Sequence, residues 1–189
     1  LEGYAFPDTY TLPRRAGAHD LVRQMVARFR TVWTPALGEA AMAMGFTTRQ
    51  ALTLASLVEK ETARAEERAT VSAVYQNRLR LRMRLQCDPT VIYALLRAGR
   101  YEGNLTRADL AFDSPYNTYR YAGLPPGPIA SPGRASLEAA VAPAGVNYLY
   151  FVSRNDGSHA FAGSLDEHNR NVFTYQVQPF RARGDGLPR

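Results

Sequence analysis

The chain has 189 residues, of which 46% are apolar and 21% charged, the balance of an ordinary globular domain long enough to bury a core. It contains no run approaching the roughly 18 apolar residues of a membrane span and no signal-peptide pattern. The chain begins at Leu1 without an initiator methionine. We therefore expect residues 1–180 to form one domain, a fragment of a longer protein, and residues 181–189 to form a disordered tail.

The net charge is +6, from 23 basic and 17 acidic side chains, which favours anionic partners. No recognised nucleic-acid-binding motif accompanies this charge, so we expect no nucleic-acid partner. Cys87 is the single cysteine, which excludes an intrachain disulfide and a cysteine-based metal site. The three histidines lack the spacing of metal ligands, and we expect neither a metal ion nor a cofactor.

The first half of the chain predicts helices joined by short breaks. Apolar residues at helical spacing predict a helix over residues 20–33, followed by breaks at Pro35 and Gly45. Thr47 with Gln50 three positions later is a capping-box pattern and predicts a helix over residues 47–65. A further helix is expected over residues 67–79.

Residues 78–85 alternate arginine with leucine or methionine. A period of two predicts a short amphipathic strand or an extended arm rather than continued helix. The arginines of this segment either face solvent or meet carboxylates of a substrate.

Asp88 and Pro89 form a helix start, an N-cap followed by proline, and predict a helix that ends near residue 99. A short helical turn is expected at residues 106–109. Residues 113–133 then predict a long loop, and its aromatic residues argue that the loop is ordered.

The last part of the chain predicts a helix from Ser131 to about residue 141, then two strands, at residues 148–152 and around residue 160. The turn residues Asn155-Asp156-Gly157 join these strands into a hairpin. Ser164 and Glu167 cap a last helix. The fold class that follows is α+β, mainly helical with one small β-hairpin.

Glu61 is the strongest candidate for a reactive group. On a helical wheel at about 100° per residue, it falls within the apolar face made by Leu54, Leu57, Val58 and Ala65, whereas Glu59 points nearly opposite. A carboxyl group in apolar surroundings resists ionisation, so its pKa rises toward the pH at which a general acid works.

A structural interpretation of Glu61 stays open. Leu52 lies on the Glu59 side, so the helix is not cleanly one-sided, and Glu61 at a helix end can pair with Arg64 or Arg68. Lys60 either holds Glu59 or turns outward.

A set of motifs, in order and at the expected spacing, resembles the YceG-like family of endolytic murein transglycosylases over about residues 1–176. The matching segments are Leu1-Glu2-Gly3, Phe6-Pro7-Asp8-Thr9-Tyr10, Glu59-Lys60-Glu61-Thr62, Glu67-Arg68, Asn77-Arg78-Leu79, Met83-Arg84-Leu85-Gln86-Cys87-Asp88-Pro89-Thr90-Val91-Ile92-Tyr93, Pro115-Tyr116-Asn117-Thr118-Tyr119, Gly123-Leu124-Pro125-Pro126-Gly127-Pro128-Ile129, Pro132-Gly133, Tyr148-Leu149-Tyr150-Phe151-Val152 and His159 through His168-Asn169. Each motif is weak alone, and together they are specific.

The resemblance implies Glu61 as the catalytic residue, on an active-site helix like that of lysozyme. It implies non-hydrolytic cleavage of the β-1,4 bond between N-acetylmuramic acid and N-acetylglucosamine, with 1,6-anhydro ends that terminate or trim nascent glycan strands. It also implies an inner-membrane anchor and a LysM-like domain upstream, both absent from this chain, a periplasmic location, and peptidoglycan synthases as candidate partners.

Four residues are candidates for substrate binding, and each has a loop-closing alternative: Gln86, Tyr116, Asn117 and Tyr119. We interpret Asp88 as a helix cap rather than a catalytic acid. Two other functions stay open, a hydrolytic muramidase that admits water, and a non-catalytic glycan-binding or scaffolding domain in which Glu61 is structural.

Overall fold

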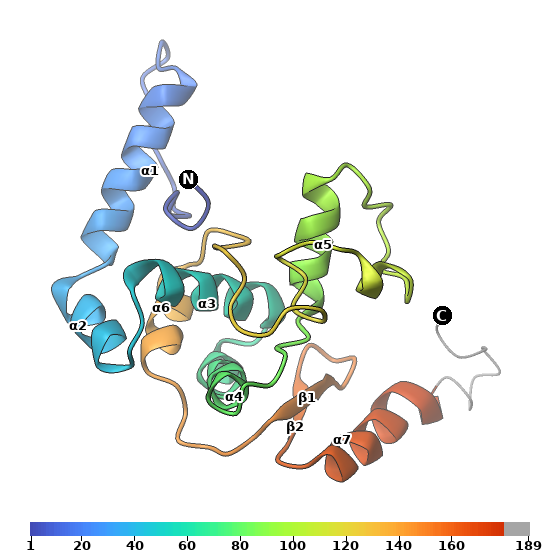
Figure 1. Cartoon of the computed structure of the whole chain (residues 1–189). Helices are drawn as coiled ribbons and strands as arrows, with labels where there is room; N and C mark the ends of the chain where they lie inside the picture. Colours follow the sequence, from blue (N-terminus) through green and yellow to red (C-terminus); the bar gives the residue numbers. More distant parts are fainter. Residues whose placement is uncertain (180–189) are drawn as a thin grey trace.

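A central helix, α3 (Thr48–Glu61), organises the described part of the chain, residues 1–179, in a computed structural model (Figure 1). It packs against α6 (Arg134–Val141), α4 (Arg68–Arg80), α2 (Pro35–Ala43) and α5 (Asp88–Arg97). The capping box predicted for its start is present, because Thr47 and Gln50 bind each other's backbone N–H groups. All side chains from Ala51 to Val58 are buried, so α3 is covered on every side rather than on one face.

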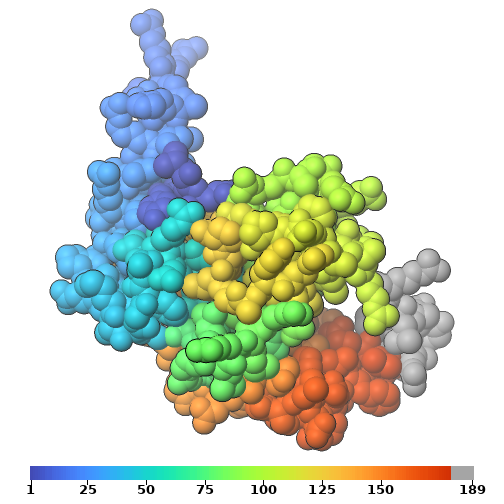
Figure 2. All heavy atoms as spheres, in the orientation of Figure 1, coloured from blue at the N-terminus to red at the C-terminus, as the bar shows by residue number. Residues whose placement is uncertain are grey.

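Helix α1 (Ala18–Val32) confirms the first predicted helix and buries only Phe29 and Val32. It rises away from the other helices, as Figures 1 and 2 show. Helix α2 was missed by the sequence prediction. Its start carries the same signal that was used at Asp88-Pro89, since Thr34 accepts a hydrogen bond from the Leu37 N–H and Pro35 is the first helical residue.

The predicted strand at residues 78–85 is wrong, and the extended-arm alternative holds for its last part. Helix α4 continues to Arg80, and Arg82 has a positive φ of 55°. Residues 83–87, here called the arm, lie outside helices and strands and lead to α5, with a second positive φ at Gln86. The physical reason is Arg78, whose buried guanidinium donates to the carbonyl oxygens of Arg84 and Leu85 and so folds the arm back on the helix.

The loop 113–133 is ordered and irregular, as predicted, and covers α3 (Figure 2). The Ile129 N–H donates to Ser56 Oγ at 3.0 Å, and Arg49 Nε donates to the Pro126 carbonyl at the same distance. A short 3₁₀ turn, Asp109–Ala111, precedes the loop. These contacts tie the loop to the helix that carries Glu61.

The predicted hairpin consists of β1 (Tyr150–Ser153) and β2 (His159–Ala162), paired antiparallel with Phe151 opposite Phe161. Ser164 caps α7 (Leu165–Val172), which continues as a π-helical turn over Phe173–Val177. The fold class is therefore the predicted mainly helical α+β. The predicted tail, 181–189, lies outside the described residues.

Within residues 1–179, no helix has the length and apolar character needed to cross a membrane.

Candidate active site

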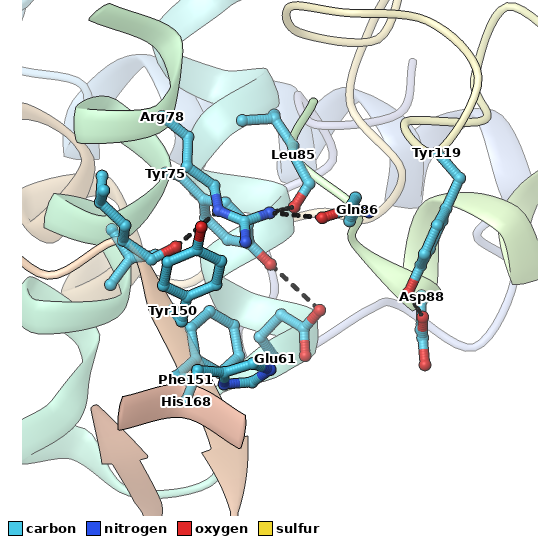
Figure 3. A pocket seen from close by; sticks show the side chains of 12 residues that line it. Glu61, Tyr75, Arg78, Leu85, Gln86, Asp88, Tyr119, Tyr150, Phe151 and His168 are labelled. Carbon is cyan, nitrogen blue, oxygen red and sulfur yellow. Dashed lines mark hydrogen bonds between the residues drawn. The ribbon is translucent and has the colours of Figure 1, made fainter. Parts of the chain in front are cut away.

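A cavity of about 360 Å³ opens beside the end of α3, where α4, the arm before α5, β1 and α7 meet (Figure 3). Its volume is within the range of small-ligand pockets. It is lined by Glu61, Val74, Tyr75, Arg78, Leu85, Gln86, Asp88, Tyr119, Leu149, Tyr150, Phe151 and His168. A larger cavity of about 690 Å³, on another part of α4, has no carboxyl group among its lining residues. The smaller one is therefore the candidate for acid–base chemistry.

Glu61 is the last residue of α3, four positions before the predicted end of the helix. Ala65 is exposed in a short 3₁₀ turn and is not part of the apolar face predicted for Glu61. The apolar residues that line the cavity with Glu61 include Val74 of α4, Leu85 before α5 and Phe151 of β1. Tyr75 from α4 donates its hydroxyl to Glu61 Oε1 at 3.0 Å.

Burial raises the pKa of Glu61 above its ordinary value, which is the direction predicted. Hydrogen bonds from the Cys87 thiol and the Tyr75 hydroxyl oppose this rise, while the Asp88 carboxylate adds to it. Burial also raises the pKa of Cys87 and of Tyr75 well above their usual ranges, so both keep their protons and act as donors. The carboxyl thus favours its proton yet has partners for its anion.

Glu59 has a structural contact on the other side of α3. Its Oε2 accepts hydrogen bonds from the Gly133 N–H at 3.1 Å and from Ser136 Oγ at 2.6 Å, at the start of α6. Lys60 is exposed. The Glu59-Lys60-Glu61 run therefore divides into an anchor for α6, a solvent-facing residue and a pocket residue.

Arg64 and Arg68, the partners considered for Glu61, make other contacts. Arg64 lies near Glu66 and Asp156, and Arg68 Nε donates to Ser136 Oγ at 3.3 Å. The structure instead gives the Glu61 carboxyl a hydrogen bond from Tyr75, and the Cys87 thiol acts on its pKa in the same direction.

Arg78 is neither a solvated arginine nor a mobile surface cation, because only 6% of its surface is exposed. Its guanidinium donates to the carbonyls of Arg84, Leu85 and Leu149 and to Gln86 Oε1, and it lies 5.0 Å from the centre of the Tyr150 ring. Arg78 therefore joins α4, the arm and β1 into one pocket wall.

Two of the four predicted substrate-binding residues, Gln86 and Tyr119, line the cavity. Gln86 has a positive φ of 52°, a strained conformation for a residue other than glycine, and such strain is concentrated at functional sites. Arg78 holds its amide oxygen at 3.2 Å, which leaves the amide nitrogen for a ligand.

The other two, Tyr116 and Asn117, do not reach the cavity. Asn117 has no exposed surface, and its amide donates to the carbonyls of Leu110 and Phe112, so it closes the loop. Tyr116 packs against Tyr93 with 4.8 Å between the ring centres. For both residues the geometry favours the loop-closing alternative.

Asp88 departs from its interpretation as a helix cap. The N-cap of α5 is Cys87, no side chain makes a capping hydrogen bond there, and Asp88 is the first helical residue. Its carboxylate instead accepts the hydroxyl of Tyr119 and lines the cavity. The pocket therefore contains a second acid.

Tyr75, Tyr150 and His168 are pocket residues that the sequence did not single out. The helix predicted over residues 67–79 includes Tyr75, and its periodicity does not indicate that the Tyr75 hydroxyl meets Glu61. His168 stacks on Tyr150, with 5.2 Å between ring centres, and burial together with the charge of Arg78 lowers its pKa. These three residues come from separate elements, so no local pattern groups them.

Within residues 1–179, no cluster of three or more His, Cys, Asp or Glu side chains is arranged to hold a metal ion.

Comparison with known proteins agrees with the family motifs. Residues 1–174 match the model of the YceG-like family. A protein of Bacillus subtilis (strain 168) named endolytic murein transglycosylase is 38% identical over 171 residues, which are 90% of this chain and 46% of the relative. A protein of the same name from Streptococcus pneumoniae serotype 2 is 35% identical over 91% of this chain and 32% of the relative.

The fold also matches a solved structure, that of a putative YceG-like protein from Listeria monocytogenes. The TM-score is 0.80 at 38% sequence identity, over 90% of this chain and 54% of that chain. The chain thus spans about half or less of the length of the relatives it matches. On the family match over nearly its whole length, the chain belongs to the YceG-like family.

Proposed function

We propose that this chain is the catalytic part of an endolytic peptidoglycan transglycosylase, with Glu61 as its acid and base. The observation that carries the proposal is the Glu61 carboxyl, which lines the cavity, has a pKa raised by burial and is held by Tyr75. The relatives named endolytic murein transglycosylase supply the substrate class.

The proposed reaction cleaves the bond between C1 of N-acetylmuramic acid and O4 of N-acetylglucosamine. Protonated Glu61 donates its proton to O4 as the C1–O4 bond breaks. The hydroxyl oxygen on C6 of the same muramoyl residue then bonds to C1, and its proton passes to the Glu61 carboxylate. Water is not consumed, the product has a 1,6-anhydro end, and Glu61 regains its proton. A single proton-transferring group of this kind typically contributes about 10² to 10⁴-fold.

The partners of Glu61 suit this double role. Burial favours the protonated carboxyl before the bond breaks, and the Tyr75 hydroxyl stabilises the anion that forms afterwards. Gln86 and Tyr119, on the facing wall, are the proposed contacts to the sugar rings.

We further propose that the full-length protein acts outside the cytoplasm on peptidoglycan strands. An upstream segment anchors it in the inner membrane with this domain in the periplasm, and a LysM-like domain also lies upstream. Peptidoglycan synthases are the proposed protein partners, because terminating a nascent strand requires access to the strand as it is made.

A hydrolytic muramidase is the second candidate, and Asp88 is the observation that favours it. Glycosidases that use water usually need two carboxyl groups about the bond they cleave. Glu61 and Asp88 both line the cavity. The names of the relatives favour the transglycosylase.

Mass spectrometry of the products tests the proposal. Purified glycan strands are digested with the unsubstituted chain, called the parent below, and with Glu61→Gln, and the masses of the new muramoyl ends are measured. Ends lighter by one water than reducing ends support the transglycosylase, and ordinary reducing ends support the muramidase. Glycan binding without cleavage by the parent chain would instead favour a scaffolding domain.

A further inference from the structure

The Asp88 side chain does not cap α5, the helix that carries it. In the first turn of α5, the Thr90 N–H and hydroxyl both bind the Cys87 carbonyl, and the Cys87 N–H binds Thr118 Oγ1. The Asp88 side chain makes none of these contacts, and it is exposed to the cavity. Capping therefore does not account for its carboxylate.

The carboxylate is nevertheless held in place. Tyr119, from the loop 113–133, donates its hydroxyl to Asp88 Oδ1, and both residues line the cavity. Burial and this hydrogen bond to Asp88 raise the pKa of Tyr119, so the phenol keeps the proton that it donates. Figure 3 shows the Asp88–Tyr119 pair on one side of an open space and Glu61 on the other. A sugar ring that reaches Glu61 therefore lies beside Asp88.

The proposed reaction needs negative charge near C1, and few residues of the cavity can supply it. Breaking the glycosidic bond builds positive charge at C1 and the ring oxygen. Glu61 begins this step protonated and becomes a carboxylate only as its proton passes to O4, so it carries no negative charge when the positive charge begins to build. Arg78 is a cation, and burial lowers the pKa of His168 and so favours its neutral form. Neither residue supplies negative charge to the cavity. Among the residues that line the cavity, Asp88 is the acid that remains to oppose the positive charge.

We infer that Asp88, oriented by Tyr119, is a second catalytic residue, whose carboxylate faces the anomeric carbon across from Glu61 and stabilises the positive charge that develops there. This inference rests on the proposed function. The residue forms no bond to the substrate: the oxygen that bonds to C1 is the C6 hydroxyl, and the proton goes to Glu61. The hydrogen bond from Tyr119 fixes the position of the carboxylate, which favours an electrostatic role over attack on C1.

Asp88→Asn tests the charge with little change in shape, because the asparagine oxygen can still accept the Tyr119 hydroxyl. Tyr119→Phe keeps the charge of Asp88 and removes the hydrogen bond that orients its carboxylate. Asp166→Asn is the matched control, since Asp166 is an exposed acid in the first turn of α7 outside the cavity. For each variant, kcat, KM and product masses are measured on glycan strands, and the melting temperature checks folding.

We expect Asp88→Asn to lower kcat about 10² to 10³-fold, with KM within a few-fold of the parent and anhydro ends still formed. We expect Tyr119→Phe to lower kcat less, by about tenfold, and Asp166→Asn to match the parent. A kcat of Asp88→Asn within threefold of the parent would overturn the inference, as would a change confined to KM. Should Asp88→Asn fail to fold, an unchanged kcat of Tyr119→Phe would overturn the inference as well.

The products of the parent chain separate this inference from the proposed function. If the parent forms anhydro ends and Asp88→Asn has the kcat of the parent, the proposed transglycosylase function holds and the role inferred for Asp88 is wrong. Ordinary reducing ends from the parent, lost in Asp88→Asn, contradict the proposed function and make Asp88 a partner in hydrolysis.

Discussion

Glu61→Gln is expected to lower the rate of cleavage strongly and at the same time to stabilise the fold near neutral pH. Glutamine keeps the shape of the side chain and an oxygen that accepts the Tyr75 hydroxyl, while it removes the acidic proton. Loss of proton transfer lowers kcat by about 10² to 10⁴-fold. The gain in stability arises because burial disfavours the charged form of Glu61 in the folded protein.

The sign of the stability change follows from linkage. Below the pKa of Glu61 in the unfolded chain, both states carry the proton and the substitution changes little. As the pH rises toward the higher folded-state pKa, the unfolded chain releases its proton first, so the parent loses stability that Glu61→Gln keeps. Each unit between the two pKa values is worth about 1.4 kcal/mol, or about 3 to 6 °C in melting temperature for a domain of this size.

The assay is thermal unfolding of the parent and the variant from pH 4 upward, beside cleavage of glycan strands. Glu59→Gln is the matched control on the same helix. Glutamine at position 59 keeps an oxygen for the Gly133 and Ser136 donors but loses the negative charge, so Glu59→Gln should cost about 1 kcal/mol at neutral pH and leave kcat of the folded protein unchanged.

Three results would refute this reasoning. Cleavage by Glu61→Gln at the parent rate would show that Glu61 is not the acid. A stability difference that does not vary with pH would mean that the carboxyl is not desolvated as described. A loss of kcat in Glu59→Gln equal to that in Glu61→Gln would remove the distinction between the two acids.

Three further substitutions have defined outcomes. Tyr75→Phe removes a donor to the carboxylate and should raise the pKa of Glu61 further; because the acid must be protonated, the alkaline limb of kcat/KM should move to higher pH, and an unmoved limb counts against the contact. Arg78→Lys should destabilise the fold by about 1 to 3 kcal/mol for each buried carbonyl left unpaired and lower cleavage as the pocket wall loosens; chemical denaturation measures the first effect, and parent-like stability contradicts it. Leu57→Ala, at a fully buried position, should cost about 2 to 5 kcal/mol, seen as a lower denaturation midpoint, while the alkaline limb stays in place.

Local signals in the sequence were sufficient for most elements. The capping box at Thr47 predicted α3 and Pro89 predicted the start of α5, because caps and proline act on the backbone within one turn, although Asp88 itself is not the cap. The same logic would have found α2 at Thr34-Pro35. The alternation at residues 78–85 led to a wrong strand prediction because its arginines have different environments. Arg78 is buried and donates to the carbonyl of Leu149, 71 residues away, whereas Arg80 and Arg82 are exposed.

The sequence by itself determined the mainly helical α+β class and the family motifs. It also predicted Glu61 rather than Glu59 as the reactive acid, since helical periodicity separates residues two positions apart. The tertiary structure alone decided what each acid meets. Tyr75 comes to Glu61 from 14 residues away, and Tyr119 comes to Asp88 from 31 residues away. Such pairs depend on how α4 and the loop 113–133 pack on α3 and α5, and no local periodicity encodes packing between elements far apart in the chain.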